Sequence, residues 1–163
     1  MLISISHTQR RLALWSAVFA LFSAYAVKAD EALVPPEPWE IVHTARAFGP
    51  AEVGRDSLRD PTIEGAIDGT PYRISFYGCW LGRKCETILF QAEFENEDWS
   101  PDLGDLDAWN AKALFGRAWL REDGRVALDH AVAMADGLPR ASLDATFEAW
   151  RMALAEYKKF LDF

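Results

Sequence analysis

The prediction of the fold starts from residues 62–79, TIEGAIDGTPYRISFYGC, which have the pattern of two strands joined by a tight turn. Asp68-Gly69 supplies the positive φ that a two-residue type I′ hairpin turn requires. This turn puts the apolar residues of both strands on one face, as a half-buried sheet requires. The predicted cross-strand pairs are Ile67 with Thr70, Gly65 with Tyr72, and Ile63 with Ile74.

A third strand is predicted at 87–95, where apolar and polar side chains alternate. If Cys79 lies opposite Cys85, the same register pairs Phe76 with Ile88, Ile74 with Phe90, and Tyr72 with Ala92, all on the core face. Cysteine spacing and apolar alternation therefore agree on one register. We predict a Cys79–Cys85 disulfide on the sheet face opposite the core. Its role is predicted to be structural, because the cysteine spacing lacks the close geometry of redox-active pairs.

Further elements follow on both sides of this hairpin. Residues 50–53 could open a short helix, and Ser100-Pro101 predicts the start of another that Gly116 ends. A second hairpin is expected around Asp123-Gly124, but its register stays open because both faces carry apolar residues. Ser142 is the expected N-cap of a long final helix. Its apolar stripe is Leu143, Phe147, Trp150, Leu154, Tyr157 and Leu161.

The first residues resemble an export signal. Arg10-Arg11 precedes a run of sixteen uncharged residues, 12–27, and Val27-Lys28-Ala29 fits a cleavage site. The run is shorter than the roughly 20 apolar residues that span a membrane. We therefore predict a signal peptide over 1–29 and a periplasmic protein with no membrane span after cleavage. An uncleaved inner-membrane anchor is the alternative.

The remainder is predicted to be a proline-rich leader over 30–47, with Trp39–Ala47 left unassigned, and one α+β domain over 48–163. In that domain a twisted antiparallel sheet of about five strands packs against helices. Cleavage removes three of the 17 basic residues and no acidic one, which changes the net charge from −8 to −11. Such a surface disfavours nucleic acids. Two cysteines alone cannot hold zinc, and no cofactor is predicted.

Several stretches together resemble the YbjN family of bacterial sensory transduction regulators, over roughly residues 50–155. They are DGTPYRISFYGC at 68–79, Cys85 with the strand 88–90, Trp109-Asn110, FGRA at 115–118, and the last helix with Trp150. The family often has asparagine two residues before the tryptophan, where this chain has Asp107. The resemblance implies a fold similar to type III secretion chaperones, binding of polypeptides, frequent dimerisation, and no catalytic residues to transfer.

Trp109, Asn110 and Tyr77 are candidates for a pocket or a junction. The favoured interpretation is a core tryptophan, with Asn110 bonded to the backbone where helix and sheet meet. Met152 and Phe160 lie off the final stripe and are candidates for a partner surface. Most of the six tryptophans after residue 29 are expected in the core. His43 stands alone, and the neighbours Asp129 and His130 point to opposite faces of a strand, so neither histidine predicts acid–base chemistry.

Two functions remain open. The favoured one is a non-catalytic periplasmic protein-binding or regulatory module, whose partner is another protein or a second copy. The chain has no lipase-type serine motif, zinc-protease helix motif, P-loop or dinucleotide fingerprint. The alternative is an envelope enzyme, a hydrolase or thiol oxidoreductase, whose site is not visible in the sequence.

Overall fold

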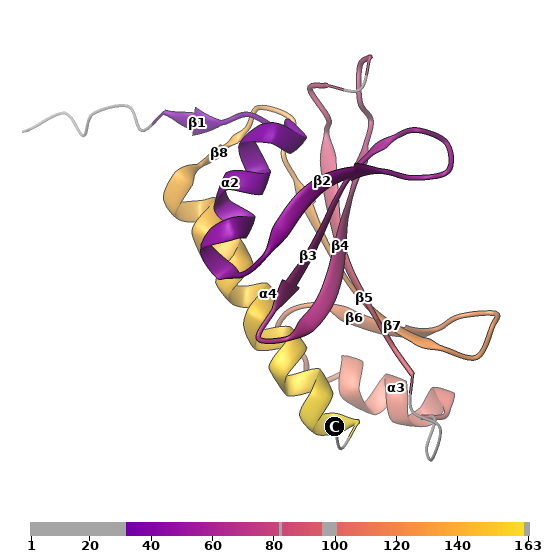
Figure 1. Cartoon of the computed structure of the whole chain (residues 1–163). Coiled ribbons are helices and arrows are strands. Elements are labelled where there is room, and N and C mark those ends of the chain that lie inside the picture. The colour runs from indigo at the N-terminus through magenta and orange to yellow at the C-terminus, as the bar shows by residue number, and fades with distance from the viewer. Residues whose placement is uncertain (1–31, 82, 96–100, 162–163) are drawn as a thin grey trace, which may run out of the picture. The chain divides into compact units, whose positions relative to one another are not determined.

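The computed structural model describes residues 32–81, 83–95 and 101–161, which belong to one compact unit (Figure 1). Its elements are β1 (Leu33–Val34), α2 (Pro38–Phe48), β2 (Ala51–Arg55), β3 (Pro61–Ile67), β4 (Thr70–Tyr77), β5 (Thr87–Phe94), α3 (Leu103–Asn110), β6 (Arg117–Leu120), β7 (Val126–Ala133), β8 (Leu138–Pro139) and α4 (Arg140–Phe160). The predicted α+β class is confirmed. The main sheet has six strands rather than about five, in the order β2-β3-β4-β5-β7-β6, and β1 pairs with β8.

The register predicted for the central strands is confirmed. In β3 and β4, Ile67 faces Thr70, Gly65 faces Tyr72 and Ile63 faces Ile74. Between β4 and β5, Ile74 faces Phe90 and Phe76 faces Ile88. The side chains that this register puts on the core face are all buried: Ile63, Tyr72, Ile74, Phe76, Ile88, Phe90 and Ala92.

Helices α2 and α4 cover that face of the sheet, and none of the helices in the described residues lies on the opposite face (Figure 1). All six residues of the predicted α4 stripe are buried, as expected. At the centre of the core the ring of Phe90 meets Phe147 edge-on at 5.0 Å and lies 5.6 Å from Trp150. Phe48, at the end of α2, stacks on Phe147 at 5.4 Å, so the first helix joins the same core.

The structure contains the predicted disulfide between Cys79 and Cys85. Its predicted face was wrong, because Cys85 is fully buried in the core and Cys79 packs against it. The chain leaves the strand at Gly78, which has a φ of 66°. Alternation of side chains holds only along extended backbone, so it does not continue past Tyr77.

The helix expected from residues 50–53 is wrong, since these residues enter β2 and pair with β3. Val53 faces Ile63, and a backbone hydrogen bond joins the N–H of Ala66 to the carbonyl of Pro50 at 3.0 Å. This pairing is a contact between neighbouring strands, and it overrides a weak local preference.

Two helix boundaries also differ from expectation. Asp102, rather than Ser100-Pro101, caps α3 through a reciprocal bond with Asp105, and the helix ends at Asn110 instead of continuing toward Gly116. The last helix begins at Arg140, so Ser142 lies within its first turn and is not the N-cap. The sequence did not determine the register of the second hairpin, and the structure pairs Leu120 with Val126.

The compact unit begins before the predicted domain boundary at residue 48. Residues assigned to the leader form β1 and α2, and Ile41, Val42 and Ala45 of α2 lie in the core. None of the helices in the described part of the chain is long and apolar enough to cross a membrane. The predicted signal peptide, 1–29, lies outside the described residues.

Replacing both cysteines, as Cys79→Ser with Cys85→Ala, should lower the melting temperature by several degrees. The bond closes a loop with a sequence separation of six residues. Such a loop is worth about 2 kcal/mol of unfolding free energy on the chain-entropy model. Thermal denaturation followed by circular dichroism measures the loss. A double variant as stable as the oxidised wild type would contradict a structural role for the disulfide.

Candidate functional site

A cleft lies at the free edge of the sheet, beside β2. Its volume is about 550 Å³. Three parts of the chain build it: the start of α2, the strand β2 with the beginning of β3, and the loop closed by the disulfide. We call it the β2 cleft, and its lining is Glu37, Pro38, Trp39, Val53, Gly54, Arg55, Pro61, Leu81 and Arg83.

Large apolar side chains are exposed in and around this cleft. Trp39 is 66% exposed and Leu81 is 81% exposed, and both line it. The neighbouring Trp80 is 70% exposed. Among the five described tryptophans only Trp109 and Trp150 are buried, so the expectation that most serve the core was wrong for these five. Exposed apolar residues gathered at one place mark interaction surfaces.

The edge of β2 presents unpaired backbone groups to the cleft. In an antiparallel pair of strands, hydrogen-bonded and non-hydrogen-bonded residue pairs alternate. Because Ala66 bonds Pro50, the pairs that Glu52 and Gly54 form with β3 are hydrogen-bonded. The N–H and C=O groups of Ala51, Val53 and Arg55 therefore point away from β3. The carbonyl of Ala51 accepts a hydrogen bond of 3.0 Å from the Arg46 side chain. Within the described residues, no backbone bond is found for Val53 on this side.

The charge in the β2 cleft is opposite in sign to that of the whole chain. Arg55 and Arg83 line the cleft against one acid, Glu37, whereas the chain carries a net charge of −8. The side chain of Arg55 donates a hydrogen bond to the carbonyl of Arg59, and no carboxylate in the described structure pairs with either arginine. The cleft therefore combines a few exposed apolar side chains with a local cationic charge.

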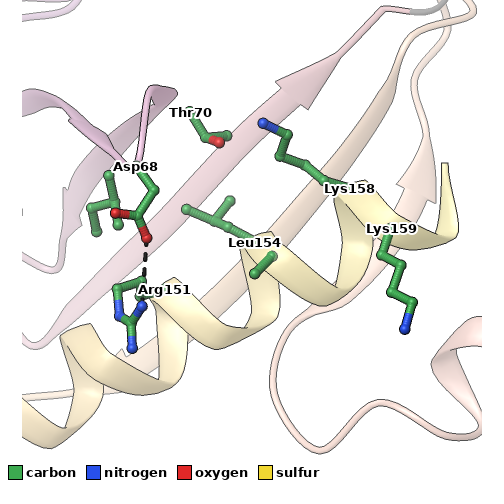
Figure 2. A pocket seen from close by; sticks show the side chains of 8 residues that line it. Asp68, Thr70, Arg151, Leu154, Lys158 and Lys159 are labelled. Atoms are coloured by element: carbon green, nitrogen blue, oxygen red, sulfur yellow. Dashed lines mark ion pairs between the residues drawn. The ribbon is translucent and has the colours of Figure 1, made fainter. Parts of the chain in front are cut away.

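A second, open pocket lies between α4 and the β3–β4 turn (Figure 2). Arg151 pairs there with Asp68 at 3.5 Å, and Lys158 and Lys159 project from the last turn of the helix. Arg151 is also bound by Glu148, so its charge is already compensated. Lysines in a last turn stabilise the helix dipole, which is a sufficient role for these two. The β2 cleft is therefore the better candidate site.

Trp109 packs in the core, and Asn110 bonds to the backbone. Trp109 is buried and meets Tyr157 edge-on at 4.8 Å. The side chain of Asn110 donates to the carbonyl of Ala118 at 2.9 Å and accepts from its N–H at 2.8 Å. Tyr77 lies away from both residues. It pairs with Thr87, which in turn pairs with Ala133 of β7. Ala118, the partner of Asn110, pairs with Leu128, five residues earlier in β7.

The two candidates for a partner surface on α4 do not form one patch. Met152 is exposed, whereas Phe160 is partly buried and stacks on Tyr157 at 5.8 Å. Eight residues separate them, which corresponds to about 12 Å along a helix. The sequence did not predict the exposed side chains near β2, because no local pattern distinguishes a surface tryptophan from a buried one.

The residues with perturbed pKa values do not form a catalytic group. His130 lies on the core face between Phe90 and Phe115, at 6.3 and 6.2 Å between ring centres, and this burial lowers its pKa. Burial raises the pKa of Asp129, which accepts hydrogen bonds from Gln91 and Trp119 on the other face. No cluster of metal-ligating side chains occurs among the described residues. The enzyme alternative thus gains no support from them.

An open antiparallel sheet with helices on one face and a cleft beside its free edge defines a small α+β domain. The model of the YbjN family, described as "Putative bacterial sensory transduction regulator", matches residues 41–163. The chain belongs to this family, as the sequence resemblance predicted, and a non-catalytic regulatory role fits that description. None of the curated proteins matches the chain.

His130 should make the domain less stable in mild acid. Because burial lowers its pKa in the folded state, the unfolded chain binds more protons once the pH falls below the ordinary histidine value of about 6.5. The melting temperature of the wild type should therefore fall more between pH 7 and pH 5 than that of His130→Gln. The exposed His43→Gln is the matched control and should keep the wild-type profile. Identical losses in all three proteins would contradict a partly buried His130 that is neutral in the folded state.

Proposed function

We propose that the chain is a non-catalytic periplasmic regulator that binds another protein at the β2 cleft. One observation carries the proposal: exposed Trp39 and Leu81 line a cleft at an unpaired strand edge. Burying such side chains against a partner is favourable at about 25 cal/mol per Å² of apolar surface. Tryptophan is also the residue type most enriched at interface hot spots. Membership of a regulator family supports the same role.

The periplasmic location rests on separate observations. A disulfide persists in oxidising compartments and is rare in the cytosol. The apolar run over residues 12–27 follows two arginines and precedes a typical cleavage sequence. An inner-membrane anchor formed by the same run would present the domain to the same compartment.

Export should produce a mature protein that begins at Asp30. N-terminal sequencing or intact-mass measurement of the protein recovered from the periplasmic fraction tests this directly. The replacement Ala29→Arg should block cleavage, because the last position before the cut requires a small residue. An uncleaved wild-type chain in the membrane fraction would favour the anchor instead.

A photo-crosslinking amino acid placed at Leu81 should join the protein to a partner in living cells. Leu114 is the matched control, because it is an equally exposed leucine, at 86% compared with 81%, and does not line the β2 cleft. We expect an adduct from position 81, identified by mass spectrometry, and none from position 114. An adduct with a second copy would identify a homodimer. Absence of adducts from both positions, or the same adducts from both, would overturn the proposed site.

A further inference from the structure

We propose that the partner binds the β2 cleft as an added strand: an extended segment of another polypeptide pairs its backbone with Val53 at the free edge of β2. The segment carries apolar and acidic side chains on one of its faces. This inference rests on the proposed function and specifies how the partner is recognised. Four observations support it: the unpaired backbone groups, the contrast between the two sheet edges, the lining of the cleft, and the charge of β2.

The unpaired backbone groups come first. Because Val53 forms a non-hydrogen-bonded pair with Ile63, its own N–H and C=O point outward, and β2 is the last strand of the sheet. Such an edge is a template for another extended chain. The carbonyl of Ala51 is occupied by the Arg46 side chain, which leaves Val53 at the centre of the open part.

The opposite edge of the sheet, at β6, is closed in a way that β2 is not. The side-chain amide of Asn110 bonds both the N–H and the C=O of Ala118, as a neighbouring strand would. Helix α3 thus covers the outward groups at the middle of β6. At one edge a side chain thus saturates both backbone groups of Ala118, whereas at the other edge Arg46 reaches only the carbonyl of Ala51, and no side chain of the described residues bonds Val53.

The lining of the cleft defines the segment's chemistry. Side chains of β2 alternate between faces, so Val53 and Arg55 share the core-side face on which the cleft opens. Every second side chain of an added strand would enter the cleft, where Trp39 and Leu81 offer apolar contact. Arg55 and Arg83, which have no carboxylate partner within the described structure, favour an acidic side chain at one of these positions.

A second copy of β2 fits this edge poorly. Two β2 strands paired antiparallel through their outward groups can adopt three registers around Val53. These registers bring Glu52 opposite its own copy, diagonal to it, or opposite Asp56 of the other chain. Like charges in these positions destabilise strand pairing. The occupant is therefore a different polypeptide with its own charge pattern.

The test uses a phage-displayed library of random twelve-residue peptides, selected on the mature protein purified from the periplasm. We expect enriched peptides to alternate, with apolar and acidic residues at every second position. Val53→Pro removes the outward N–H, whereas Val53→Ala keeps it and trims only the side chain. The Kd of a synthesised, enriched peptide should rise at least tenfold for Val53→Pro and less than threefold for Val53→Ala. Arg83→Glu should also weaken binding, whereas Arg117→Glu, at the other edge, should not.

Methylation of alternate backbone nitrogens in the same peptide gives an independent measurement if Val53→Pro fails to fold. It should abolish binding when the methylated nitrogens face β2 and leave binding intact when they face away. Equal affinity for Val53→Pro and wild type, insensitivity to both methylation patterns, or the lack of any enriched peptide would overturn strand addition. Adducts from Leu81 that persist in Val53→Pro would reject this mode while leaving the proposed function standing.

Discussion

The cross-strand register of β3, β4 and β5 is the constraint on which the other features of the domain depend. It places Ile63, Ile74 and Phe90 in one row on the face that α2 and α4 cover. A shift by one residue would turn that row toward the face without helices and expose it to water. Gly65 helps to fix the register, because an added Cβ would lie 2.7 Å from the Tyr72 ring across from it. Only a glycine allows that ring to lie flat over the neighbouring strand.

The same register determines how each edge of the sheet ends. On one side the strands continue to β6, where α3 returns and Asn110 occupies the backbone groups of Ala118. On the other side they end at β2, which has Val53 at its centre and the exposed side chains of Trp39 and Leu81 beside it. Folding thus buries one row of apolar residues and leaves another group uncovered at a free edge. This asymmetry is the physical basis of the proposed binding function.

The sequence predicted features that depend on local patterns. The Asp68-Gly69 turn is recognised from a dipeptide, and β5 and α4 are recognised from the spacing of their apolar residues. All three features are confirmed. The strand β2 was missed because its five residues, including Gly54 and Arg55, acquire strand character only through pairing with β3. The cleft was not predicted either, because the beginning of α2, the edge strand and the disulfide loop come together only in the folded chain.

Amide hydrogen exchange along β2, measured by NMR on the isolated protein, directly tests the register of this strand and its free edge. An alternating pattern is expected along the strand. The N–H groups of Glu52 and Gly54, bonded to β3, should exchange slowly, and that of Val53 should exchange rapidly. Slow exchange at Val53, together with rapid exchange at its two neighbours, would show that the register and the free edge are both wrong.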